Sequence, residues 1–147
     1  MKYRKIIFVC RDNSTLSPMA EAIYKSICTY EDVSILSRGL VVFFKSPINP
    51  KVEVTLSSHG IKDVKQKTEP LEEADLEHGT LVLAMDKRQK MLFHEKYPLI
   101  EISTLCEYVG EKEIEDPYGG NLMDYDKYFS EMSLVLRKLS DRLEEEK

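Results

Sequence analysis

Short apolar runs alternate along the chain with segments whose apolar residues recur at helical spacing. The run 5–9 is short and rich in β-branched residues, which predicts a buried strand that ends at Cys10. Ser17 and Pro18 then supply an N-cap and a first-turn proline for a helix. The apolar residues of that helix are Met19, Ala20, Ile23, Tyr24 and Ile27. Residues 10–16 are therefore expected to form a strand-to-helix loop.

The same alternation continues to the end of the chain. Further strands are expected at 33–36, 81–85 and 100–102, and helices at 50–60, 68–73 and 86–96. A long terminal helix is predicted by one apolar face, formed by Tyr125, Tyr128, Phe129, Met132, Val135, Leu136, Leu139 and Leu143. This order of strands and helices indicates an α/β domain in which helices cover both faces of a parallel sheet.

Composition places the chain among ordinary globular proteins. Its 147 residues, 42% apolar and 32% charged, suit one domain spanning 1–147 with a sizeable core. The net charge of -5 argues against broad binding to nucleic acid or to acidic membranes. The chain has no apolar stretch long enough for a signal peptide or a membrane span, so a cytoplasmic location is expected. Its three cysteines, Cys10, Cys28 and Cys106, lack the spacing of a disulfide framework or metal site, and no cofactor or metal is expected.

The loop that follows the first strand is the strongest candidate for chemistry. Its main-chain N–H groups can converge at the positive end of the helix, which is an arrangement that binds phosphate. A cysteine in that position has its thiolate favoured by the same groups, and we expect this to lower the pKa of Cys10. The hydroxyl of Ser17 can add a hydrogen bond to the sulfur. The loop therefore predicts a cysteine nucleophile beside an oxyanion site.

The residues Cys10, Asn13, Ser17, Pro18, Met19, Ala20 and Glu21 resemble the signature of the low-molecular-weight protein tyrosine phosphatases. The likeness continues through the segments 37–40, 81–86, 104–109 and 115–120. The last two segments resemble the stretch that carries the general acid in this family, notably in the bacterial branch that includes protein-arginine phosphatases. It covers essentially the whole chain in the right order. The resemblance implies a single-domain three-layer sandwich, with a four-stranded parallel sheet in the order 2-1-3-4.

The resemblance also implies a reaction with a cysteinyl-phosphate intermediate. Cys10 would attack phosphorus while the phosphate-binding loop holds the oxygens, and Asp116 would protonate the leaving atom and later activate water. That loop comprises Arg11, Asp12, Asn13, Ser14, Thr15, Leu16 and Ser17. Tyr118, with Phe43 or Phe44, is expected to wall an aromatic substrate slot.

Three positions depart from the pattern of that family. The family's loop arginine falls at Leu16, its glycine at Asp12 and its second loop cysteine at Thr15. Loss of a phosphate-binding arginine costs about 10³ to 10⁵ in rate, by analogy with arginine fingers. Arg38, and with less support Arg11, could supply a relocated guanidinium or neutralise Asp12; the alternative is that both are solvated surface residues.

Three functions stay open from the sequence. The first is a phosphomonoesterase acting on phosphotyrosine, phosphoarginine or a small phosphomonoester. The presence of both Cys10 and Asp116 favours this function, because a protein that only binds phosphate needs no proton donor. The second is a disarmed phosphate- or phosphoprotein-binding regulator, which the leucine at position 16 favours. The third, a thiol redox role, has the least support, and an arsenate reductase would need resolving cysteines within 83–90, where none occurs. The expected partner is a phosphorylated protein or small phosphomonoester, bound by a monomer or weak dimer.

Overall fold

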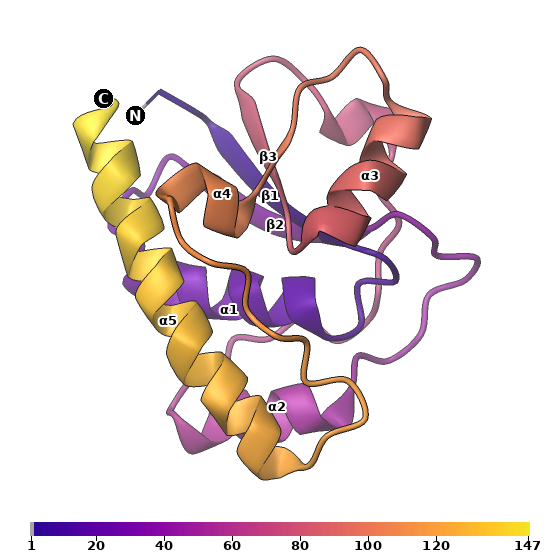
Figure 1. Cartoon of the computed structure of the whole chain (residues 1–147), viewed down its shortest axis with the longest axis vertical. Coiled ribbons are helices and arrows are strands. Elements are labelled where there is room, and N and C mark those ends of the chain that lie inside the picture. The colour runs from indigo at the N-terminus through magenta and orange to yellow at the C-terminus, as the bar shows by residue number, and fades with distance from the viewer. Residues whose placement is uncertain (1) are drawn as a thin grey trace.

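The computed structural model describes residues 2–147. Its four strands form one parallel sheet in the order β2-β1-β3-β4, which confirms the expected topology. Figure 1 shows the arrangement of the elements. In chain order these are β1 (Lys5–Cys10), α1 (Leu16–Ile27), β2 (Ser34–Gly39), α2 (Pro50–Ser58), the 3₁₀ helix η1 (Glu73–Asp75), β3 (Thr80–Ala84), α3 (Lys87–Lys96), β4 (Ser103–Thr104), α4 (Leu105–Val109) and α5 (Leu122–Glu145).

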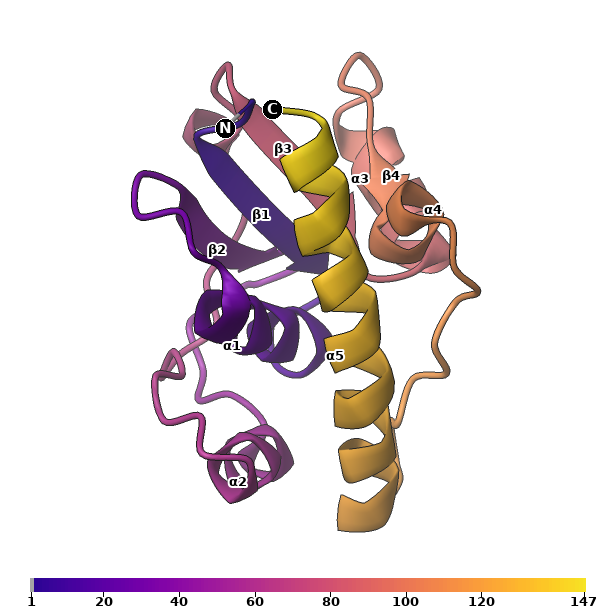
Figure 2. The same cartoon turned by 90° about the vertical axis from the view of Figure 1, so that its left-hand side faces the viewer.

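Helices cover both faces of the sheet, as the alternating pattern predicted. Alternate residues of β1 point to opposite faces, because side chains along a strand have a period of two. Ile6 and Phe8 belong to the larger core, with residues of α1, α2, α4 and α5. Ile7 and Val9 belong to a smaller core that includes Phe93 of α3. Figure 2 shows α1 and α5 on one side of the sheet.

Three local expectations were wrong. Helix α1 begins at Leu16, and its N-cap is Thr15 without a side-chain bond, so Ser17 lies inside the helix instead of capping it. Most of 68–73 is extended, because this segment runs alongside the end of β2 and pairs with it through a parallel bridge between Gly39 and Pro70.

The fourth strand lies at 103–104 instead of 100–102. The N–H of Ile100 is used in a turn, where it donates to the carbonyl of Tyr97 at 3.1 Å, so the chain joins the sheet only after this turn. The short helix α4 was not expected; a reciprocal capping box between Thr104 and Glu107 starts it.

The carboxyl ends of β1 and β2 meet at one edge of the sheet. Cys10 is in register with Gly39, and the N–H of Leu40 donates to the carbonyl of Cys10 at 2.9 Å. A Cβ atom on Gly39 would lie 2.9 Å from the carbonyl carbon of Asp12 and 3.0 Å from the nitrogen of Asn13. The glycine therefore lets the loop after β1 lie directly against the end of β2.

The two ends of the chain lie together at the opposite edge of the sheet (Figure 1). The ammonium group of Lys2 is 3.7 Å from the carboxylate of Glu146. Within residues 2–147, none of the helices combines the length and the apolar character that crossing a membrane requires.

Candidate active site

The sulfur of Cys10 lies at the base of the loop, at the end of β1. It is 2.8 Å from the hydroxyl oxygen of Ser17, and the residue is only 3% exposed. The main-chain N–H groups of Asn13 and Ser17 also act on the sulfur and favour its thiolate. The predicted contact between Ser17 and Cys10 is therefore present, although Ser17 makes it from inside the helix and not from the cap.

The expected lowering of the Cys10 pKa is not what the structure gives. Burial raises the pKa of the Cys10 thiol above its ordinary value, and the hydrogen bonds from Ser17 and from the loop N–H groups oppose this rise without cancelling it. The Asp12 carboxylate adds a smaller contribution in the same direction as burial. The sequence argument considered the N–H groups but not the desolvation of a sulfur that is almost fully enclosed.

Asn13 holds the loop in shape from within. Its backbone is left-handed, with φ of 59°, and its side chain is completely buried. The amide nitrogen donates to the hydroxyls of Ser17 at 2.9 Å and Ser37 at 3.0 Å. The side-chain oxygen accepts from the ammonium of Lys65 at 2.7 Å and from the N–H of Glu69 at 2.9 Å. All four hydrogen bonds available to this amide are formed, so the loop geometry is fixed by one side chain.

A buried lysine behind the loop was not predicted from the sequence. The Lys65 side chain is 9% exposed, and its ammonium also contacts the Ser37 carbonyl at 3.0 Å and the Glu69 carboxylate at 3.0 Å. Burial lowers the pKa of Lys65, whereas Lys65 in turn holds the pKa of Glu69 below its usual value despite the partial burial of that carboxyl group. A positive charge therefore lies close behind the loop that is expected to bind an anion.

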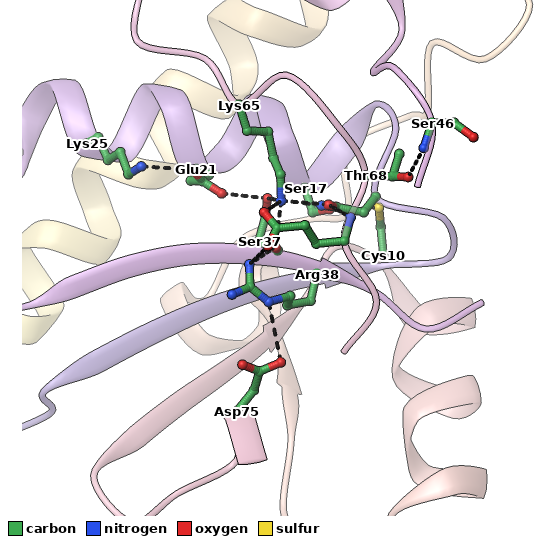
Figure 3. A network of polar contacts seen from close by, with 12 residues as sticks. Cys10, Ser17, Glu21, Lys25, Ser37, Arg38, Ser46, Lys65, Thr68 and Asp75 are labelled. Carbon is green, nitrogen blue, oxygen red and sulfur yellow. Dashed lines mark hydrogen bonds and ion pairs between the residues drawn. The ribbon is translucent and has the colours of Figure 1, made fainter. Parts of the chain in front are cut away.

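This network extends from the sulfur to the surface (Figure 3). The hydroxyl of Ser37 donates to the Glu21 carboxylate at 2.6 Å, and Lys25 pairs with the other oxygen of Glu21 at 2.9 Å. Ser37 is a buried polar residue, and it lies on the same face of β2 as the buried, apolar Ile35. That alternation is the one sequence signal that could have marked Ser37; nothing in the 62–67 segment distinguishes Lys65 from its exposed lysine neighbours.

Arg38 does not replace the loop arginine in this structure. Its guanidinium lies 3.4 Å from Asp75 and 3.6 Å from Glu69, and it donates to the Ser37 carbonyl at 2.9 Å. Figure 3 shows the side chain directed toward Asp75 and away from Cys10. The reason is strand alternation: Ser37 faces α1 and the loop, so the next residue faces the other side of the sheet. Arg11 is exposed.

The remaining loop residues lie as follows. The Asp12 carboxylate accepts from the N–H of Ser14 at 3.0 Å and from its hydroxyl at 2.7 Å, so it is bound to the loop and not to Arg38. Thr15 accepts a 3.3 Å hydrogen bond from the Asn49 side chain. Leu16 is 6% exposed and is part of the larger core. The apolar residue at the family's arginine position is therefore used for packing.

Asp116 lies in the connection between α4 and α5, which passes in front of α1 in Figure 1. One carboxylate oxygen accepts from the N–H of Tyr118 at 2.9 Å, and the carbonyl of Pro117 accepts from Gly120 at 2.8 Å. Asp116 and Cys10 both raise the pKa of the buried Tyr128, after the larger effect of burial. Asp116 lines one pocket with Tyr128, and Tyr128 belongs to the same core cluster as Cys10.

The three expected aromatic walls do not line one cavity. Phe43 and Phe44 are 90% and 78% exposed and lie with Asp12 and Ser14 around a cavity of about 200 Å³. Tyr118, which is 90% exposed, lines a different cavity together with Asp116. The phenylalanines therefore lie beside the loop, whereas the tyrosine lies with the Asp116 carboxylate in a separate cavity.

The pattern of the Low molecular weight phosphotyrosine protein phosphatase family matches residues 5–147. The chain belongs to this family. It is 31% identical to a protein-arginine-phosphatase of Bacillus subtilis (strain 168) over 153 residues, covering 97% of this chain and 98% of that protein. It is 32% identical to the low molecular weight protein-tyrosine-phosphatase PtpB of Staphylococcus aureus over 139 residues, covering 93% of this chain and 97% of that one.

The fold agrees with solved members of the low molecular weight phosphatases. The crystal structure of a YwlE mutant from Bacillus subtilis superposes with a TM-score of 0.87 at 32% identity, covering 95% of this chain and 98% of that chain. The family assignment made from the Cys10 loop is confirmed, and with it the assignment of the chain to a family of phosphatases.

Proposed function

We propose that this chain is a phosphomonoester hydrolase that uses Cys10 as nucleophile and Asp116 as general acid. The observation that carries the proposal is the 2.8 Å contact between the Cys10 sulfur and the Ser17 hydroxyl, inside a loop whose N–H groups favour the thiolate. A sulfur held in this way can attack phosphorus while the loop amides receive the equatorial oxygens. Such an arrangement has little purpose in a protein that only packs its core.

Asp116 suits the second role. The oxygen that accepts from Tyr118 fixes the orientation of the carboxyl group, and the side chain is exposed, so its other oxygen is accessible to a bound ligand. As an acid it would protonate the leaving oxygen or nitrogen, and as a base it would then activate water against the cysteinyl phosphate. Both steps return the enzyme to its starting state without a cofactor.

We expect the rate to be low for this fold. Leu16 supplies no charge to the phosphate, Arg38 is engaged on the other face of the sheet, and the raised pKa of Cys10 leaves less thiolate at neutral pH. These same observations support a second candidate, a regulator that binds phosphorylated proteins without turning them over. Lys65 provides a positive charge behind the loop in either case.

The proposed substrates are phosphorylated side chains of proteins, phosphotyrosine or phosphoarginine, with small phosphomonoesters as a further class. Relatives of similar identity are named as phosphatases of either kind, so identity does not separate the two. The exposed Phe43 and Phe44 beside the loop favour an aromatic ester.

Hydrolysis of p-nitrophenyl phosphate by the wild type, Cys10→Ser and Leu16→Arg proteins tests the proposal. Activity in the wild type that Cys10→Ser abolishes supports the enzyme, and Leu16→Arg should then raise kcat by about 10³ or more. Leu16→Met is the matched control, since it changes the side chain without adding charge. A silent wild type with an active Leu16→Arg would favour the regulator, and silence of both would refute the assigned roles.

A further inference from the structure

A strongly acidic pocket lies beside Asp116, between the 113–120 segment and the first turns of α5. It has a volume of about 440 Å³. Its ionisable lining consists of five carboxylates and one ammonium group, from Glu113, Glu115, Asp116, Asp124, Glu131 and Lys127. The excess of negative charge is large for a cavity of this size, and a cation entering it would lower the electrostatic energy.

Two of these carboxylates, Glu113 and Glu115, have no role in holding the fold. By contrast, Asp124 accepts the N–H of Asn121 at 2.9 Å as part of the α5 capping box, and Glu131 lies 4.0 Å from Lys127. Within residues 2–147, Glu113 and Glu115 have neither an ion-pair nor a hydrogen-bond partner. Their charges are therefore available to a ligand.

Tyr128 gives an independent indication that the pocket is built to receive a polar group. It lines the pocket and is only 3% exposed, yet its hydroxyl has no hydrogen-bond partner among the residues that the structure describes. Burial and the nearby Asp116 raise the pKa of this phenol, so it stays neutral and its oxygen can accept a hydrogen bond. The fully enclosed side-chain oxygens without a partner in residues 2–147 are those of Thr55 and Thr80, so the Tyr128 hydroxyl is not sealed off, and its oxygen is accessible to a ligand in the pocket.

The spacing of the acidic groups argues for an extended organic cation. Among residues 2–147, no three acidic, histidine or cysteine side chains come close enough together to hold a metal ion. Separate carboxylates around one cavity, with a phenol oxygen among them, match a guanidinium or ammonium group on a flexible side chain.

We propose that this pocket binds an arginine or lysine side chain of the phosphorylated protein substrate, next to the phosphorylated residue. The inference rests on the proposed function, because Asp116 lines the pocket and would also serve the reaction. A substrate chain with its phosphate in the Cys10 loop would then present a basic neighbour to Glu113 and Glu115. The acidic pocket would select basic phosphorylation sites and reject acidic ones.

The test compares two phosphotyrosyl peptides that differ only in arginine or its neutral analogue citrulline beside the phosphotyrosine. Their kcat/KM values are measured with the wild type, and their dissociation constants with Cys10→Ser by fluorescence anisotropy. We expect about a fivefold preference for the arginine peptide, falling below about twofold in Glu113→Gln/Glu115→Gln, because exposed ion pairs each contribute modestly. About 1 M NaCl should also remove it, since the Debye length is then about 3 Å.

Glu95→Gln/Glu101→Gln removes the same charge from the distant groove along α3 and is the matched control. It should keep the preference, whereas Tyr128→Phe should reduce it. Equal use of both peptides, or a preference unchanged in the Glu113 and Glu115 variant, would overturn the inference even if p-nitrophenyl phosphate is hydrolysed. If that ester is not hydrolysed, the proposed function fails, and the anisotropy arm still decides whether the pocket binds arginine.

Discussion

The ammonium group of Lys65 donates a 2.7 Å hydrogen bond to the side-chain oxygen of Asn13 in the loop after β1. Asn13 is the one residue other than glycine with a positive φ in residues 2–147, so the loop conformation depends on what holds its side chain. Lys65 therefore connects a buried positive charge directly to the shape of the anion site.

Replacing Lys65 with methionine should lower the free energy of unfolding by about 1 to 3 kcal/mol, because charge-assisted hydrogen bonds are lost and Glu69 keeps only its longer, 3.6 Å ion pair with Arg38. Urea denaturation measures this loss. Binding of inorganic phosphate should weaken as well. Lys67→Met, at a neighbouring exposed lysine, is the control and should change neither quantity. Unchanged stability in Lys65→Met would show that the ammonium is not what holds Asn13.

Gly39→Ala should disturb the loop without altering any of its residues. The added Cβ would lie 2.9 Å and 3.0 Å from main-chain atoms of Asp12 and Asn13, and backbone cannot move aside as a flexible side chain can. We expect a loss of about 1 to 3 kcal/mol in stability and a weaker affinity for phosphate. Gly60→Ala tests the opposite case, since its Cβ would have open space but its φ of 79° is unfavourable. That variant should lose stability alone.

Alkylation of Cys10 by iodoacetamide should be slow at neutral pH. Its rate should increase with pH, and the midpoint of this increase should lie above the value for an ordinary cysteine, about 8.5. Burial is the cause, because it penalises the thiolate more than the hydrogen bonds of the loop favour it. Mass spectrometry of the labelled peptide gives the pH profile. Leu16→Arg should lower the midpoint by placing a positive charge in the loop. A midpoint at or below 8.5 in the wild type would contradict the effect of burial.

Stability should fall steeply above about pH 10. Burial raises the pKa of Tyr24 and of Tyr128, so between the unfolded and folded pKa values the native state binds more protons than the unfolded state, and the free energy of unfolding decreases as pH rises. Tyr128→Phe should reduce this slope by up to about 1.4 kcal/mol per pH unit. Tyr118→Phe, at an exposed position, should leave it unchanged. Denaturant titrations at several alkaline pH values measure the slope.

Sequence pattern was sufficient where it reports burial. The strand ending at Cys10 and the apolar face of α5, including Tyr128, follow from spacing alone because each must bury one face in the core. It failed where tertiary hydrogen bonds decide the conformation. The 68–73 segment has helical composition but is mostly extended, because the N–H of Gly39 donates to the carbonyl of Glu69, and the N–H of Leu71 donates to the carbonyl of Gly39 at the end of β2.

The site was predictable in its residue types but not in its electrostatics. Cys10, Asn13 and Ser17 were identified from the loop, and the structure brings them together. Lys65 was missed, since it reaches the loop from a distant segment with no periodicity. The raised pKa of Cys10 was missed because the degree of enclosure of one sulfur depends on how Leu16 and the rest of the core pack around it.

Because Lys2 and Glu146 meet at the edge of the sheet remote from Cys10, both ends of the chain are convenient handles. A fluorophore, an affinity tag or a surface tether attached at either end would point away from the loop and leave its mouth unobstructed. The same proximity makes the chain suited to circular permutation, with a brief glycine-rich bridge between the old ends and new ones opened in the exposed 31–32 turn.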